Sequence, residues 1–314
     1  MSGSSYVLPG KASTVVDVKK EPHVLVVGMD GVRYDSLRSA GSPALGRIAE
    51  HGFLVPVRVH AKNATISGPV WATVASGVHA DRHGVTGNSH HPAELGRFQD
   101  FTAVLRSARP ESQTMVAASW HPLAVRTACG PIFSSGGWVP TPDPEEANDA
   151  VSWLRADDAV ADYASGRLGA ENLAVSFVYF GEADVEAHNH GTGPDYIAAI
   201  QRCDSRLNSL LDVIDSRPNH HREDWTVIVV TDHGHLDAGG HGGESEVERT
   251  AWIAASGASL PQGITAADHA DIFHQVLATF GVTPDREVAE SGGAPFGARQ
   301  GATPRLAQRG GGTR

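Results

Sequence analysis

Short apolar runs alternate along the chain with segments in which apolar residues recur at helical spacing. The clearest runs span residues 23–29, 173–180 and 225–231, and a shorter one spans Thr114 to Ala118. The clearest amphipathic segment extends from Asp195 to Asp215. Continuously apolar strands separated by amphipathic helices are typical of a parallel sheet that is covered on both sides. We therefore predict an α/β fold with a mostly parallel central sheet and helices on both faces.

The pattern predicts one large domain between two loosely patterned ends. Residues 1–21 are polar and rich in Ser and Gly, so we expect a flexible lead. Residues 286–314 combine Gly, Pro and Arg with few apolar positions, which predicts disorder. The catalytic domain is expected over residues 22–285. Within it, the poorly patterned stretch 119–169 is expected to be an insertion that folds as a cap over the site.

Polar residues follow each of the three longest apolar runs. Asp30 directly follows the first run, Asp184 comes shortly after the second, and Asp232-His233 follows the third. Because ligands of open α/β sheets bind beyond the carboxyl ends of the strands, we expect these side chains to meet. Each also has a common structural explanation, since Asp-Gly forms turns and Asp caps helices.

Two histidines add further residues of metal-ligand type. On a helix, Asp184 and His188 lie on one face because they are four residues apart. His241 lies within the segment Gly239-Gly240-His241-Gly242-Gly243, where glycine permits unusual backbone dihedral angles and close approach. Taken singly, an Asp-x-x-x-His pair is more often a solvated helix face, and a glycine-rich segment is more often a surface loop.

Ser67 lies at a turn-rich entry to a helix of small residues that continues to Ser76-Gly77. A serine at this position could simply cap the helix. The N-terminus of a helix would also favour an anionic phosphate nearby. Ser67 is therefore a candidate nucleophile whose role depends on the residues around it.

The order and spacing of these motifs resemble the alkaline-phosphatase superfamily, and within it the type I phosphodiesterase and nucleotide pyrophosphatase branch. The similarity extends over roughly residues 24–283. It is carried by the segments Met29-Asp30-Gly31-Val32-Arg33, Ser67-Gly68-Pro69-Val70-Trp71, Arg82-His83-Gly84-Val85, Asp184-x-x-x-His188, Thr231-Asp232-His233-Gly234 and Gly240-His241-Gly242-Gly243. Singly these segments are ambiguous, but all of them occur here in the order that the family has.

The resemblance implies two divalent metal ions and a covalent mechanism. The implied ligands are Asp184, His188 and His241 for one ion, and Asp30, Asp232, His233 and the Ser67 oxygen for the other. Mixed imidazole and carboxylate ligands suit zinc best, with manganese or iron as alternatives. Ser67 is then the nucleophile that forms a phosphoserine intermediate, and Asn88 holds a phosphoryl oxygen. The neighbouring histidines are expected outside the ligand set: His83, His90, His91, His190 and His235.

The segment around the nucleophile departs from the family pattern. The family usually has Thr followed by an aromatic residue, Pro, Asn and His, whereas Ser67 is followed by Gly-Pro-Val-Trp. Trp71 occupies the place at which sulfatases carry arginine, so we do not expect a sulfatase, and Trp71 is a candidate substrate contact. Thr65 is an alternative nucleophile, although the position of Pro69 favours Ser67.

The segment after the strand near Ala118 bears on the substrate. Branches that act on phosphomonoesters bring a pair of Lys or Arg side chains there, whereas this chain has Ser-Trp-His-Pro at 119–122 and Arg126 as the nearest cation. A diester carries less charge and needs less cationic clamping. We predict a phosphodiesterase or nucleotide pyrophosphatase for a small phosphorylated substrate, with a nucleotide as one example. The alternatives are a phosphomonoesterase, a phosphonate hydrolase, or a non-catalytic protein that binds metal or phosphate.

Composition limits the partners. The formal net charge of −11 argues against binding to a nucleic-acid polymer, which requires an excess of Lys and Arg. Cys129 and Cys203 are too few for a disulfide framework. Signal-peptide and membrane-spanning patterns are lacking, so we expect a cytoplasmic protein without a membrane partner. The pattern leaves the oligomeric state and the physiological substrate open.

Overall fold

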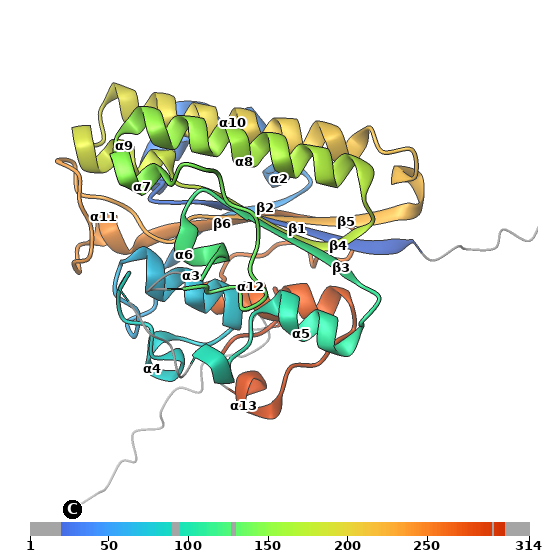
Figure 1. The fold of residues 1–314 in the computed structure, drawn as a ribbon. Coiled ribbons are helices and arrows are strands. Elements are labelled where there is room, and N and C mark those ends of the chain that lie inside the picture. The colour runs from blue at the N-terminus through green and yellow to red at the C-terminus, as the bar shows by residue number, and fades with distance from the viewer. Residues whose placement is uncertain (1–19, 90–94, 127–129, 291, 299–314) are drawn as a thin grey trace, which may run out of the picture.

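The computed structural model describes residues 20–89, 95–126, 130–290 and 292–298, and its centre is a six-stranded sheet (Figure 1). The strands are β1 (Glu21–Met29), β2 (Gly52–Arg58), β3 (Gln113–Ala118), β4 (Leu173–Phe180), β5 (Glu223–Val230) and β6 (Thr250–Ser256). Their order across the sheet is β2-β6-β5-β1-β4-β3. The central strand β1 is parallel to both neighbours, β4 and β5, and β3 is parallel to β4. Because β6 is antiparallel to both β5 and β2, β6 is the reversed strand of a mostly parallel sheet.

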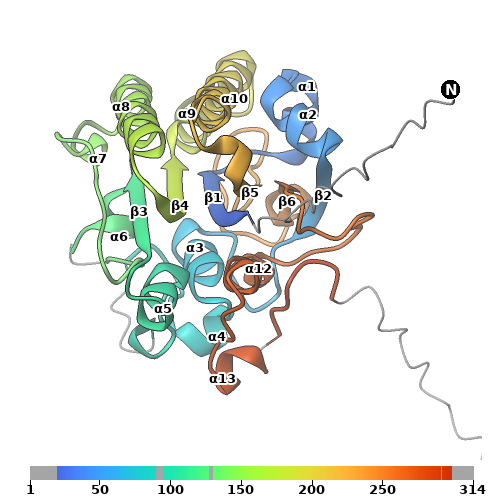
Figure 2. The ribbon, with the colours of Figure 1, turned by 90° about the vertical axis from the view of Figure 1, so that its right-hand side faces the viewer.

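Helices cover both faces of the sheet (Figures 1 and 2). One layer contains α1 (Tyr34–Ala40), α2 (Pro43–Glu50), α8 (Ala150–Ala170), α9 (Glu182–His190) and α10 (Pro194–Asp215). The other contains α3 (Ser67–Ser76), α4 (Ala80–His83), α5 (Phe101–Ala108), α6 (His121–Ala124), α12 (His269–Thr279) and α13 (Arg286–Ala289). Short helices α7 (Pro144–Ala147) and α11 (Glu246–Arg249) and the 3₁₀ helices Leu95–Arg97 and His220–Arg222 lie in connections. The predicted α/β class with a covered, mostly parallel sheet is confirmed.

The apolar run of β1 shows why a sheet of this kind forms. Successive side chains of a strand point to opposite faces. Val24 and Val26 therefore pack in the core on the α3 side, whereas Leu25 and Val27 pack in the core on the α10 side. All four side chains are fully buried, and burying an aliphatic side chain of this size stabilises the fold by about 1.5–3 kcal/mol.

The predicted elements lie close to the observed ones, and two further strands were not expected. The amphipathic segment 195–215 is confirmed as α10, and the four apolar runs form β1, β3, β4 and β5. The additional strands are β2 and β6. β2 contains Pro56, which is tolerated because β2 is an edge strand.

The predicted cap over 119–169 divides into two parts with different positions. α8 packs against β4 and α10, so it belongs to the helical layer and the prediction of a cap is wrong for this part. The segment before α8 contains α6 and α7 and reaches the edge of the pocket described below. In the part of the chain that the structure describes, every helix is too short or too polar to span a bilayer.

The two ends differ from the expected lead and tail. β1 already begins at Glu21, within the predicted lead, and residues 1–19 lie outside the described residues. The prediction of disorder is wrong for the start of the tail, where Arg286–Ala289 forms α13 and Phe296 packs edge-on against Phe53 with ring centroids 5.2 Å apart. Residues 299–314 lie outside the described residues.

Candidate active site

Three neighbouring strands bring the predicted ligands to one edge of the sheet. Asp30 follows β1 directly, and Asp232 and His233 follow the adjacent β5. On the other side of β1, β4 leads into α9, which carries Asp184 and His188. The connection 231–249 leaves β5 at this edge and, because β6 is antiparallel, returns to the same edge. His241 lies in this connection.

Asp30, Asp232 and His233 form a fully buried cluster, which we call the inner site. His233 Nε2 lies 3.1 Å from Asp232 Oδ2 and 3.8 Å from Asp30 Oδ1. Within the described part of the chain, none of these three atoms has a hydrogen-bond partner. Zinc bonds of about 2 Å place two ligand atoms of one ion roughly 3–4 Å apart. The inner site therefore has the spacing of a metal site.

Asp184 and three imidazoles form a second cluster, the outer site. His188 Nε2 lies 3.0 Å from His241 Nε2 and 3.5 Å from Asp184 Oδ2. Asp184 Oδ1 lies 3.6 Å from His241 Nε2 and 2.8 Å from His235 Nε2. His235 is thus a member of the cluster, and the expectation that it lies outside the ligand set is not supported by its position.

The histidine tautomers favour metal binding at both sites. His241 Nδ1 lies 2.7 Å from the Thr65 carbonyl oxygen, and His233 Nδ1 lies 3.2 Å from the Gly234 carbonyl oxygen. Because a carbonyl oxygen can only accept, Nδ1 carries the proton in each ring, and the Nε2 lone pair faces the cluster. In His233 this lone pair faces Asp232 Oδ2 and Asp30 Oδ1, so the three atoms need a shared proton or a cation between them. A cation relieves such a contact, so the residues of the inner site fit a metal ion.

The electrostatics of the two sites differ because of their burial. Burial raises the pKa of Asp232 to about 8. Burial, together with repulsion from Asp232 and Asp184, also raises the pKa of Asp30. Burial lowers the pKa of His233, so its ring is neutral. For Asp184, burial opposes ionisation, but the hydrogen bond with His235 and the nearby imidazoles lower its pKa. Without a cation, the two inner carboxyl groups cannot both ionise at neutral pH.

Ser67 is the first residue of α3, and it is buried, with 5% of its surface exposed. Beside it, Gly68 N donates to Asn88 Oδ1 at 2.8 Å, which fixes the Asn88 amide next to the helix N-terminus. A Cβ atom at Gly68 would lie 2.5 Å from the Gly87 carbonyl oxygen, so this approach requires glycine. Thr65, the alternative nucleophile, is instead fully buried and bonded to the backbone of Gly242 and Gly243.

Ser67 and Asn88 share a pocket of about 340 Å³ with the outer site. Its lining consists of Ser67, Asn88, Trp120, Glu145, Asn148, Trp153, Tyr179, Gly181, Asp184, Val185, His188 and Asn189. Among the described residues, no lysine or arginine lines this pocket, and Arg126 does not reach it. Glu145 is fixed at one wall because Trp120 Nε1 donates to its Oε1 atom at 3.0 Å.

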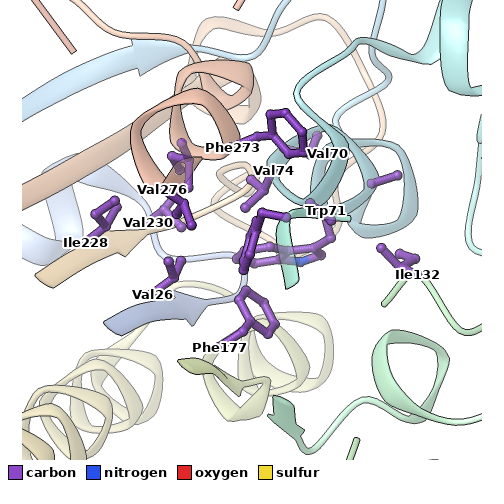
Figure 3. Packing of buried hydrophobic residues seen from close by; sticks show 14 of the residues in the cluster. Val26, Val70, Trp71, Val74, Ile132, Phe177, Ile228, Val230, Phe273 and Val276 are labelled. Carbon is purple, nitrogen blue, oxygen red and sulfur yellow. The ribbon is translucent and has the colours of Figure 1, made fainter. Parts of the chain in front are cut away.

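Trp71 does not line the pocket, which corrects its predicted role as a substrate contact. Its side chain is 1% exposed and packs between α3 and the sheet, with Phe177 and Val74 among its labelled neighbours (Figure 3). Its indole Nε1 donates to Asp30 Oδ2 at 2.9 Å. Trp71 is therefore a partner of a predicted ligand. The pocket residues that sequence reasoning missed are Trp120, Glu145, Asn148, Trp153, Tyr179 and Asn189.

Comparison with known proteins identifies the family. The model of the family "Type I phosphodiesterase / nucleotide pyrophosphatase" matches residues 24–254. A curated relative, mouse ectonucleotide pyrophosphatase/phosphodiesterase family member 7, is 21% identical over 243 residues, which cover 70% of this chain and 52% of the relative. The chain thus spans about half the length of this relative.

Solved structures share the fold. Murine ectonucleotide pyrophosphatase/phosphodiesterase 5, an inactive variant in complex with AMP, superposes with a TM-score of 0.58 at 15% identity, covering 84% of this chain and 96% of that chain. A putative sulfatase from Bacteroides thetaiotaomicron superposes with a TM-score of 0.66 at 14% identity, covering 88% of this chain and 74% of the sulfatase chain. At such identities these likenesses show the fold alone. The family model spans most of the domain, and the chain therefore belongs to the type I phosphodiesterase / nucleotide pyrophosphatase family.

Proposed function

We propose that the chain is a two-metal phosphodiesterase that hydrolyses small phosphodiesters through a phosphoserine intermediate on Ser67. One observation carries the proposal. The unpartnered ligand atoms of Asp30, Asp232 and His233 converge at the edge of the sheet where α3 presents Ser67 to the pocket. A binding protein needs the ligands but not a hydroxyl at a helix N-terminus, so the combination favours catalysis. Family membership supports the same reaction class.

The proposed metal ligands are divided between the two sites. Asp30, Asp232, His233 and Ser67 would hold one ion. Asp184, His188 and His241 would hold the other, with His235 beside it. The mixture of imidazole and carboxylate favours zinc. When bound, two such ions supply Lewis-acid stabilisation for an alkoxide on Ser67 and for the negative charge of the phosphoryl group.

The chain's own residues then account for the covalent steps. Ser67 Oγ loses its proton to solvent and attacks phosphorus, so a Ser67 Oγ–P bond forms while the P–O bond to the leaving group breaks. The leaving oxygen departs with a proton from water. Water then attacks the phosphoserine, which restores the Ser67 hydroxyl and releases a phosphomonoester. The N-terminus of α3 and the fixed Asn88 amide favour the charged phosphoryl group throughout.

The pocket lining favours diesters over monoesters. A monoester dianion requires cationic side chains, but no Lys or Arg stands among the described pocket residues, and Glu145 adds negative charge. The volume of about 340 Å³ suits a group of small size. The AMP complex of the murine structural neighbour supports a nucleotide as one such group.

Hydrolysis of two chromogenic substrates tests this function. Zinc-loaded protein is expected to hydrolyse bis-p-nitrophenyl phosphate with a higher kcat/KM than p-nitrophenyl phosphate, because the monoester carries an extra charge that the pocket does not compensate. A preference for the monoester would assign the chain to phosphatase chemistry. Hydrolysis of neither substrate, with zinc bound, would favour a binding protein.

Glu145 is expected to strengthen the preference for diesters. In Glu145→Gln, removal of the carboxylate charge is expected to raise kcat/KM for p-nitrophenyl phosphate roughly two- to fivefold, the size of a screened interaction between charges at the surface. The value for bis-p-nitrophenyl phosphate should change less. Glu146→Gln is the matched control, because Glu146 is the exposed neighbour on α7 and does not line the pocket. Equal changes in both variants would exclude a selective role for Glu145.

A further inference from the structure

We propose that Trp71 and Tyr179 are positioning residues that hold Asp30 as a metal ligand through a single oxygen, Oδ1. The inference rests on the metal centre of the proposed function and adds two residues that are not ligands themselves. Both come from elements that also line the pocket or carry the nucleophile, α3 and β4.

Both donors bond to the same carboxylate oxygen. Trp71 Nε1 donates to Asp30 Oδ2 at 2.9 Å, and the Tyr179 hydroxyl donates to Oδ2 at 2.5 Å. The three side chains are at most 3% exposed, so water does not compete for these bonds. The Tyr179 hydroxyl and the Trp71 indole each carry a proton that can be donated to a carboxylate oxygen. The Oδ2 atom is thereby fully engaged.

The other oxygen of Asp30 has the opposite environment. Oδ1 has no hydrogen-bond partner within the described part of the chain, although it is buried. It lies 3.8 Å from His233 Nε2, the ligand atom of the neighbouring histidine. A carboxylate with two free oxygens can bind an ion through one or both of them. With Oδ2 engaged by two donors, Asp30 can offer only Oδ1, and the donors also fix the orientation of its carboxylate plane.

The surrounding packing leaves the indole of Trp71 little freedom. A Cβ atom at Gly28 would lie 2.6 Å from Cη2 of Trp71, so the ring lies directly over the backbone of β1. The ring of Tyr179 meets it edge-on with centroids 5.3 Å apart, and Phe177 lies beneath it at 6.1 Å (Figure 3). The two hydrogen-bond donors therefore stabilise each other's positions.

Trp71 also connects the ligand to the nucleophile. Ser67 and Trp71 are four residues apart on α3, so they lie on the same face of the helix, one turn from each other. A shift of α3 would therefore move Ser67 and the Asp30 carboxylate together. Trp71 thereby couples the position of Ser67 to that of the Asp30 carboxylate, although Trp71 itself does not line the pocket.

Metal affinity is the direct test, because it is measured without substrate. Trp71→Phe removes the N–H donor and keeps an aromatic ring, and Tyr179→Phe removes the hydroxyl alone. Competition with a chromophoric chelator should show zinc binding at the inner site weakened about 10- to 100-fold in each variant, the usual effect of removing a partner of a ligand. Cobalt-substituted protein should show an altered visible spectrum in both, since Asp30 gains a free second oxygen.

The matched controls remove similar groups away from the site. Trp225→Phe deletes an indole N–H that donates to Glu223 at the opposite end of β5, and Tyr163→Phe deletes a hydroxyl bonded to Arg167 on α8. Both should keep wild-type affinity and spectrum. If Trp71→Phe and Tyr179→Phe lower only the melting temperature of the chelated protein, with affinity and spectrum unchanged, the two residues are structural and the proposal is wrong. Wild-type protein that binds no zinc would overturn the metal centre itself.

Discussion

Ser67→Ala is expected to lower kcat/KM for bis-p-nitrophenyl phosphate by about a thousandfold or more, the scale on which removal of a catalytic nucleophile acts. Among the described pocket residues the side-chain hydroxyls belong to Ser67 and Tyr179, and Tyr179 donates to Asp30. This leaves Ser67 as the pocket hydroxyl free to act as the proposed nucleophile. The measurement is initial-rate hydrolysis by zinc-loaded protein at saturating metal.

Two variants serve as controls for this result. Ser76→Ala removes a hydroxyl from the same helix, where it donates to the Ala72 carbonyl oxygen away from the pocket. Thr65→Val tests the alternative nucleophile, which is bonded to the glycine-rich segment. Both variants are expected to retain most of the activity if they fold. Full activity in Ser67→Ala, or loss confined to Thr65→Val, would show that another group is the nucleophile.

The affinity of the inner site for zinc is expected to fall about tenfold for each pH unit below pH 8, because each bound ion must displace a proton. In metal-free protein, burial raises the pKa of Asp232 to about 8, so this group is protonated below that pH. The sign follows from linkage: a raised carboxyl pKa stabilises metal-free protein at low pH, and this contribution is lost as the pH rises through 8. Zinc should therefore raise the melting temperature more at pH 8 than at pH 6.

Asp232→Asn should abolish both the tight binding and its dependence on pH, since the amide neither titrates in this range nor supplies a charge. Asp237→Asn is the control, because Asp237 is an exposed carboxylate in the same connection that pairs with Arg33. Isothermal titration at several pH values measures both effects. An affinity that is constant between pH 6 and 8 would show that no proton is displaced from Asp232.

The convergence of the proposed ligands could be predicted from the sequence, because most of them follow strands whose ends lie side by side. Asp30 and Asp232 directly follow continuously apolar runs, and adjacent parallel strands end at one edge of a sheet. His188 and His241 required the resemblance as well, since each has a common structural explanation. His235 was missed although it is two residues from His233, a spacing that places both side chains on one side of an extended segment.

The role of Trp71 could not be predicted, and the reason is the composition of α3. All ten residues of this helix are buried, so no polar face marks which side meets the sheet. Because the sequence does not show which side of the helix faces the sheet, a tryptophan four residues after Ser67 fits a pocket wall as well as a core position. Glu145 and Asn148 were missed for a different reason: they lie in a segment without periodicity, where only tertiary contacts place the chain.

Because β6 runs antiparallel to β5, the 231–249 connection starts and ends at the same end of the sheet. It can therefore be replaced by another segment without changing the strand order. The connection begins and ends on neighbouring strands, where Val230 of β5 pairs with Ile253 of β6. Arg249, at its end, donates hydrogen bonds to the carbonyl oxygens of Val59, His60 and Asn63. Residues between His235 and Glu244 can therefore be changed without altering the strand order, except Gly239, where a Cβ atom would lie 2.1 Å from the Ala187 carbonyl oxygen. Libraries confined to positions 236–238 and 240–243 would test whether this segment sets the metal preference of the proposed outer site.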